Sequence, residues 1–231
     1  MVDWRYFEYL DDFVNSSLQS HSFITVDFYG KINIKDFCSA LEKCTNLQKL
    51  TLNFYGKKIR DKSALRIGSA ITQCINLSIL NLYFDNNQIG NKGASCVGSR
   101  LANCINLQNL TLALSSNQIG NEGASGLGSA LANCTNLSNL KLLLGRNQIG
   151  DNGVSGLGFG LGKCNNLYNL ELELNENEIG DQGISDLGSA LSSKNNLSKL
   201  ILDFDNELEN LKVKNKYLKS KRLVIFKIYF K

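Results

Sequence analysis

A strict thirty-residue period is the feature of this chain that most limits what it can fold into. Five cysteines follow one another at this interval, and Lys194 stands where a sixth would fall: Cys44, Cys74, Cys104, Cys134 and Cys164. Columns of leucine keep the same interval, beginning at Leu47, Leu50 and Leu52. Such a period is typical of solenoids, in which a repeat buries its apolar face only against its neighbours.

Each repeat has the pattern of a strand, a turn and a helix. In one copy, three leucines alternate with other residues, as in a strand with one buried face: Leu110, Leu112 and Leu114. A turn follows, and we expect Asn121 to be the N-cap of a helix. Apolar residues of that helix recur at helical intervals: Ala124, Leu127, Leu131 and Cys134.

The repeats set the expected domain organisation. Degenerate copies near both ends bring the number of predicted strands to about eight, in one domain over residues 1–231. We expect a capping helix over residues 1–20, repeats over 21–210, and a basic capping unit over 211–231. These predictions define an α/β chain with a parallel sheet.

The pattern L-x-x-L-x-L-x-L-x-x-N-x-I-G resembles leucine-rich repeat proteins, and its long helical half is most similar to the ribonuclease-inhibitor-like class. The Asn-Gln-Ile-Gly and Gly-Ala-Ser phrases are similar to repeats of ciliate protists. The resemblance implies a horseshoe solenoid with a parallel sheet on its concave face and helices on its convex face. The asparagine lies five residues beyond the third leucine, which predicts a strand extended by two residues.

Several chemistries lack the residues they need. His21 is the only histidine, which removes histidine metal sites and most general-base schemes. The seven cysteines include no Cys-x-x-Cys pair, and they indicate a buried column of free thiols. The glycine-rich segment 156–160 lies inside a predicted helix, where it cannot act as a phosphate-binding loop. We therefore expect no enzyme activity, no metal and no cofactor.

Charge is distributed unevenly along the chain. The last 21 residues hold eight of the 25 basic residues and no acid, so the remainder has 17 basic against 21 acidic residues. A body of this kind does not favour nucleic acid as a partner. We interpret the basic tail as a guard of an edge strand, with binding to an acidic surface as the alternative. No apolar stretch approaches a membrane helix of about 18 residues, and we expect a cytoplasmic protein.

The predicted sheet face carries the residues that vary between repeats. Residues that alternate with the leucines face outward, and they differ from copy to copy while the leucine columns do not. We expect tyrosine anchors in the early strands, Leu143 in mid-sheet, and acids toward the C-terminal end. The candidate partner-binding residues are Tyr55, Tyr83, Asp85, Leu143, Glu171, Glu173, Asp203 and Asp205.

These residues favour a non-catalytic scaffold that binds another protein, including one with a basic segment, and no small-molecule substrate. The ciliate-type resemblance implies a structural role in a cytoskeletal or ciliary assembly of several proteins. Two alternatives follow from the ribonuclease-inhibitor-like class. One is regulation of a small GTPase, as in Ran GTPase-activating proteins, and the other is inhibition of a ribonuclease.

Overall fold

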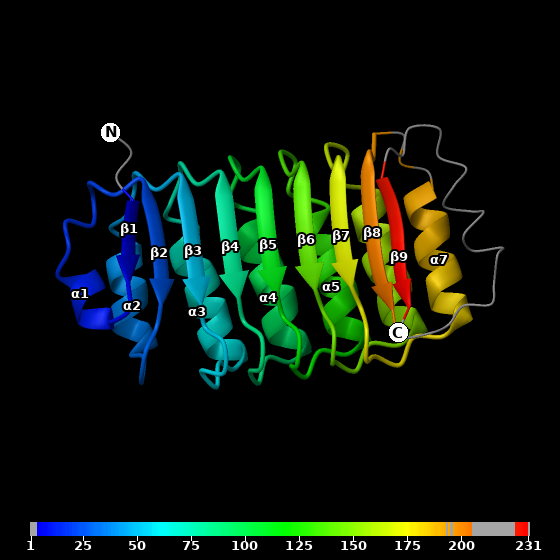
Figure 1. The fold of residues 1–231 in the computed structure, drawn as a ribbon, viewed down its shortest axis with the longest axis horizontal. Helices are drawn as coiled ribbons and strands as arrows, with labels where there is room; N and C mark the ends of the chain where they lie inside the picture. Colours follow the sequence, from blue (N-terminus) through cyan, green and yellow to red (C-terminus); the bar gives the residue numbers. More distant parts are fainter. Residues whose placement is uncertain (1–3, 193, 195, 205–224, 231) are drawn as a thin grey trace.

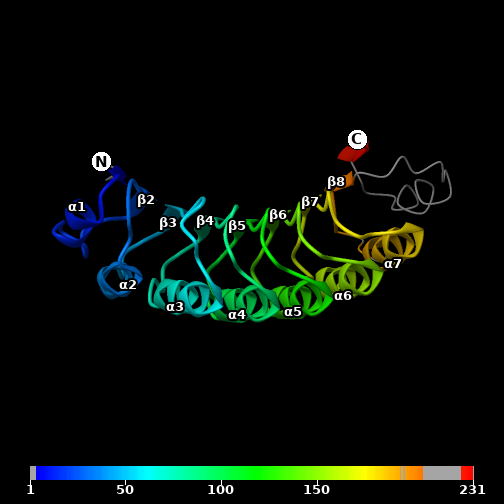
Figure 2. The ribbon, with the colours of Figure 1, turned by 90° about the horizontal axis from the view of Figure 1, so that it is seen from below.

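The computed structural model describes residues 4–192, 194, 196–204 and 225–230. Within them the strands lie side by side in chain order as one parallel sheet (Figure 1). Figure 2 shows a shallow arc, with the sheet on its inner side and the helices in a row on its outer side. The strands are β1 Trp4–Phe7, β2 Phe23–Asp27, β3 Lys49–Asn53, β4 Ile79–Tyr83, β5 Asn109–Ala113, β6 Asn139–Leu143, β7 Asn169–Glu173, β8 Lys199–Phe204 and β9 Ile225–Phe230. The helices are α1 Leu10–Val14, α2 Ile34–Leu41, α3 Asp61–Ile71, α4 Asn91–Leu101, α5 Asn121–Leu131, α6 Asp151–Gly162 and α7 Asp181–Ser192.

The repeat period sets the register of the sheet. Leu80 of β4 pairs with Leu110 of β5, which pairs with Leu140 of β6, so each leucine column crosses neighbouring strands. The eight predicted strands correspond to β2–β9. Backbone hydrogen bonds continue past the strand ends, for example from Phe54 N to the Tyr83 carbonyl at 2.8 Å. The strand itself ends at Asn53, so the predicted extension appears only as these further backbone hydrogen bonds.

The N-terminal region differs from the single helix expected over residues 1–20. Strand β1 pairs in parallel with β2 and adds a ninth strand to the sheet. Helix α1 has only five residues. Aromatic residues favour strands, and in Trp4-Arg5-Tyr6-Phe7 only Phe7 is buried.

The core is the apolar interior between the sheet and the helices. The leucine columns are buried, and so are Cys44, Cys74, Cys134 and Cys164, while Cys104 is partly exposed. Lys194 occupies the same position in the last repeat, where its buried amine donates a hydrogen bond to the Cys164 carbonyl. All seven cysteines are free thiols, as expected.

Glycines let neighbouring helices approach one another closely. A Cβ atom placed on Gly160 of α6 would lie 2.2 Å from the backbone of Gly128 in α5. On Gly93 of α4, a Cβ atom would lie 2.3 Å from Asp61 of α3. Close packing of neighbouring helices therefore explains these repeated glycines.

The role expected for Asn121 is corrected by the structure. Gly120 is the N-cap of α5 and Asn121 is its first residue. The Asn121 side chain instead accepts hydrogen bonds from Gly150 N at 2.7 Å and Gly153 N at 3.0 Å, at the start of α6. Asn91 does the same for α5, so the first residue of one helix caps the next helix.

Candidate functional site

The candidate site is the sheet face on the inner side of the arc. Every second residue of a strand points to this face and is partly exposed, while its neighbours are buried. Parallel pairing places residues of one repeat position next to each other, so that Lys141 lies beside Glu171 and Leu143 beside Glu173. Among the described residues the outward rows predicted from sequence are confirmed, except that Ala113 and Gly145 are buried.

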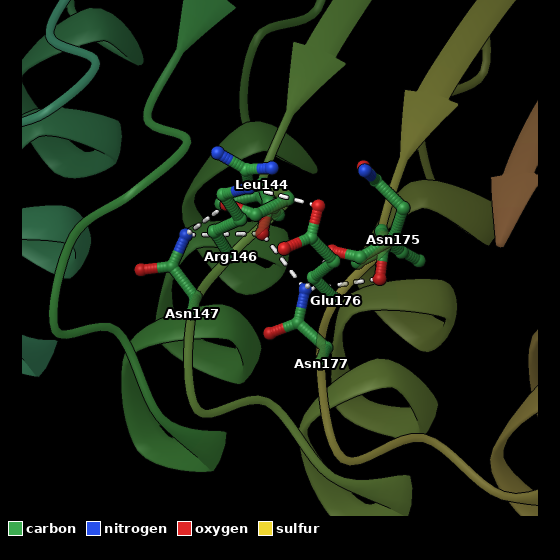
Figure 3. A network of polar contacts seen from close by, with 8 residues as sticks. Leu144, Arg146, Asn147, Asn175, Glu176 and Asn177 are labelled. Atoms are coloured by element: carbon green, nitrogen blue, oxygen red, sulfur yellow. Dashed lines mark hydrogen bonds and ion pairs between the residues drawn. The ribbon is translucent and has the colours of Figure 1, made fainter. Parts of the chain in front are cut away.

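A column of asparagines fixes the turns at the lower edge of this face. In the close view of Figure 3, the Asn177 Nδ2 donates to the carbonyls of Leu144, Leu174 and Asn175 at 2.9, 3.0 and 3.2 Å. Its Oδ1 accepts from Ile149 N at 3.0 Å. The equivalent contacts recur at Asn87, Asn117 and Asn147. These asparagines form a ladder along the repeats, in which each side-chain amide hydrogen-bonds backbone groups of its own and the preceding repeat.

The early strands present aromatic rings. Tyr55 is 60% exposed at the turn after β3, and Tyr83 of β4 is partly exposed. Tyr83 pairs with Ala113, which pairs with Leu143 of β6. Since Ala113 is small and buried, Tyr83 and Leu143 form the two ends of a short apolar strip.

Asp85 lies at the turn after β4 and supports the backbone there. Its Oδ1 accepts a hydrogen bond from Ser115 N at 3.0 Å. Desolvation raises the pKa of the Asp85 carboxyl, while the hydrogen bond from Ser115 opposes this shift. The contact ties the carboxylate to the next repeat, which the sequence analysis did not anticipate.

Two acids of the later repeats form ion pairs with cations of the preceding repeat. Glu171 of β7 forms an ion pair with Lys141 of β6, and Glu176 pairs with Arg146 at 2.8 Å (Figure 3). Glu173 and Asp203 pair in register on the same face. Asp205 lies outside the described residues. The expected acidic region is therefore a mixed-charge region over β6 and β7, with two acids beside it.

A row of asparagines in mid-sheet was missed by the sequence analysis. Asn139 Nδ2 donates to Asn109 Oδ1 at 2.7 Å, and Asn169 Nδ2 donates to Asn139 Oδ1. These side chains line a shallow hollow of about 290 Å³, together with Lys141, Glu171 and Lys199. The signal was present, because the three asparagines stand at one repeat position, directly before a core leucine.

The other groups of chemical interest lie away from this face. Burial raises the pKa of the Cys44 thiol to about 12 and that of Cys164 to about 11, so both are protonated near neutral pH. His21 is buried beside Ser16, at 3.2 Å from its hydroxyl. Among the described residues, no cluster of histidine, cysteine or acidic side chains could hold a metal ion.

In the part of the chain that the structure describes, no helix has the length and apolar character needed to cross a membrane. Comparison with protein families matches three segments to the family described as Leucine Rich repeat: residues 106–128, 136–158 and 169–188. No curated protein sequence matches the chain.

Two solved structures resemble the chain at low identity. An internalin C2 from Listeria monocytogenes is 20% identical, with 83% of this chain and 74% of that chain covered and a TM-score of 0.42. The actin-binding site 2 of leiomodin-1 is 14% identical, with 83% of this chain and 91% of that chain covered and a TM-score of 0.49. From the family match and the register of the sheet, we conclude that these three segments are leucine-rich repeats and that the described coils stack as a solenoid.

Proposed function

We propose that the chain is a non-catalytic scaffold that binds a protein partner through its sheet face. The observation that carries this proposal is the contrast between the buried rows of the sheet, whose residues repeat, and the outward row, whose residues vary. Buried rows repeat leucine from strand to strand, while the outward row beside them reads Thr51, Asn81, Thr111, Lys141, Glu171 and Ile201. A rigid frame that keeps its core and varies one surface is suited to binding.

The residues proposed to bind are those predicted from the sequence. Tyr55 and Tyr83 offer rings of the kind that dominate interface energies, and Leu143 extends their apolar contact. Glu173 and Asp203 lie beyond them, where they can steer a basic segment of the partner. Glu171 contributes with Lys141 as a pair, and Asp85 mainly holds the turn.

The proposal is tested by capture of proteins from the source organism with two matched variants. Tyr55→Ser combined with Tyr83→Ser removes the rings of the sheet face. Phe159→Ser removes a ring that is 62% exposed on helix α6, on the other side of the molecule. We expect the sheet variant to lose a partner that the wild type and the helix variant both retain. Equal retention by all three proteins, each shown to be folded, would contradict the proposal.

The two alternative functions are tested with the same purified protein. Inhibition of a basic ribonuclease draws support from Glu173 and Asp203, which share one outward row. A titration of ribonuclease activity measures it directly. Regulation of a small GTPase predicts faster GTP hydrolysis, which single-turnover assays with candidate GTPases measure. An effect in either assay that survives removal of Tyr55 and Tyr83 would separate that activity from the proposed binding surface.

We also propose that the scaffold works in the cytoplasm, within a cytoskeletal or ciliary assembly. The seven free thiols support a reducing compartment. The resemblance of the repeats to ciliate proteins supports the assembly. Imaging of the tagged protein against cytoskeletal markers tests both parts, and localisation to a secretory compartment would contradict them.

A further inference from the structure

Aromatic rings gather at the N-terminal end of the sheet face. Strand β1, which the sequence analysis did not expect, adds Trp4 and Tyr6 beside β2. Tyr29 and Tyr55 follow the ends of β2 and β3. The exposed fractions of Trp4, Tyr6, Tyr29 and Tyr55 are 57%, 57%, 59% and 60%. Four large rings exposed at one end of a sheet indicate a contact surface. We call these four residues the aromatic end.

A cation already rests on one of these rings. Trp4 stacks on Phe23 of β2, with ring centroids 5.0 Å apart. The Lys49 Nζ of β3 lies 4.8 Å from the centre of the Trp4 ring. This geometry is that of a cation–π contact, so the aromatic end can hold a positive group on a ring.

Carboxylates lie among the rings. Asp27 accepts a hydrogen bond from Asn53 Nδ2 at 2.9 Å. Partial desolvation and the charges of Asp27 and Glu8 raise the pKa of Tyr6. Two cations lie at the edges of this group: Lys49 lies over Trp4, and Lys57 donates to the Gly30 carbonyl at 3.2 Å. The ring of Tyr6 therefore lies close to the carboxylates of Asp27 and Glu8.

We propose that the aromatic end binds arginine side chains of a partner's peptide segment. The inference rests on the proposed function, since it gives the chemistry of a partner at one end of the same face. A guanidinium group stacks flat on tyrosine or tryptophan and forms two parallel hydrogen bonds with a carboxylate such as Asp27. A lysine amine is a more strongly hydrated point charge, and it matches this combination of rings and acid less well.

Trp4 is the only tryptophan of the chain, so its fluorescence reports on this surface. The probes are synthetic dodecapeptides of alternating arginine and glycine, lysine and glycine, and glutamate and glycine. We expect a saturable change in Trp4 emission with the arginine peptide, and binding about tenfold tighter than that of the lysine peptide. Isothermal titration calorimetry provides a second measure of the same affinities.

Matched variants locate the binding. Asp27→Asn keeps the acceptor for Asn53 but removes the charge, and Tyr29→Ala removes an exposed ring. Each should weaken binding of the arginine peptide at least about fivefold. Glu122→Gln on helix α5 and Tyr168→Ala before β7 remove an acid and an exposed ring elsewhere, and they should leave the affinity unchanged.

The inference is overturned if the arginine peptide gives neither a saturable fluorescence change nor a calorimetric signal. It is also overturned if the lysine peptide binds equally well, or if Asp27→Asn and Tyr29→Ala bind as the wild type does. Failure of the proposed function is a separate result. It would appear as partner capture that persists after both Tyr55 and Tyr83 are replaced. Failure of this inference would leave partner capture through Tyr83 intact.

Discussion

Asn117 shows how one buried side chain links consecutive repeats of the solenoid by hydrogen bonds. Its Oδ1 accepts from Ile89 N at 2.9 Å in the preceding repeat. Its Nδ2 donates to the carbonyls of Phe84 and Leu114 at 2.9 and 3.0 Å. An amide both donates and accepts, so one side chain joins two consecutive turns. A side chain without an amide would leave several buried backbone groups without a partner.

Replacing Asn117 with alanine should therefore be costly. We expect Asn117→Ala to lower the free energy of unfolding by about 3 kcal/mol, because buried backbone groups lose their hydrogen bonds. Gln118→Ala, at the exposed neighbouring residue, should change it by less than about 0.5 kcal/mol. Urea denaturation followed by circular dichroism measures both. Equal stability of the two variants would show that the asparagine ladder is not needed for the fold.

At the scale of the element, a helix is placed by the helices beside it. Asn91 and Asn121 cap the helices that follow their own, and Gly128 and Gly160 bring α5 and α6 into close contact. A helix in this row is therefore incomplete without its neighbour, both in hydrogen bonds and in packing. A single repeat cannot show this, which is why Asn121 was expected to cap its own helix.

The close contact of α5 and α6 predicts an unusual effect of alanine. Alanine normally favours a helix over glycine by about 1 kcal/mol. At Gly160 its Cβ would meet Gly128 backbone atoms at 2.2 Å, so we expect Gly160→Ala to destabilise the protein by about 2 kcal/mol or more. At Gly68 the nearest atom is the Arg100 Cβ at 3.2 Å, and Gly68→Ala should change stability by less than about 1 kcal/mol. Thermal unfolding of both variants compares them, and similar stabilities would contradict the packing described.

The thiol column predicts how stability depends on alkaline pH. Burial raises the pKa of Cys44 to about 12, whereas a thiol in the unfolded chain ionises near pH 8.5. Its stabilising contribution is complete below the unfolded pKa and is lost as the pH rises toward the folded pKa. Between about pH 9 and 11, Cys44 should therefore lower the unfolding free energy by about 1.4 kcal/mol per pH unit. Urea denaturation across this range should show a shallower pH slope for Cys44→Ala than for the wild type, and equal slopes would refute the assignment.

At the scale of the whole molecule, the solenoid is a row of equivalent coils. Neighbouring strands pair with the same register from β3 to β8, and each described coil contacts mainly the coils before and after it. The stability of such a row depends on the coils and on the contacts between neighbours. A whole coil can then be removed without disturbing the rest of the pattern.

Deletion of residues 106–135, one full period, should leave a folded protein. The deletion joins Ile105 to Asn136, which takes the place of Asn106 in the repeat. We expect cooperative unfolding with a reduced denaturant dependence, because less surface is exposed. Deletion of residues 106–120, half a period, should abolish cooperative unfolding. If both deletions fold equally well, the coils are not equivalent units.

The sequence predicts the interior of this molecule well and its surface only in part. The column from Leu50 to Leu200 locates the six coils from β3 to β8, because this position is buried in each of them. Strand β1 has no equivalent leucines, so the period does not reveal it. The pairing of Lys141 with Glu171, the contact of Asp85 with Ser115 and the row of Asn109, Asn139 and Asn169 arise between coils. They become evident only when the register of neighbouring strands is known.

The claim that the sheet face binds the partner is tested most directly by hydroxyl-radical footprinting of the purified complex. This method reports the solvent exposure of individual side chains. Binding should lower the oxidation of Tyr55, Tyr83 and Leu143, and leave Phe159 on α6 and the exposed Ile105 unchanged. Protection confined to Phe159 or Ile105, with the three sheet-face residues oxidised as in the free protein, would contradict the account.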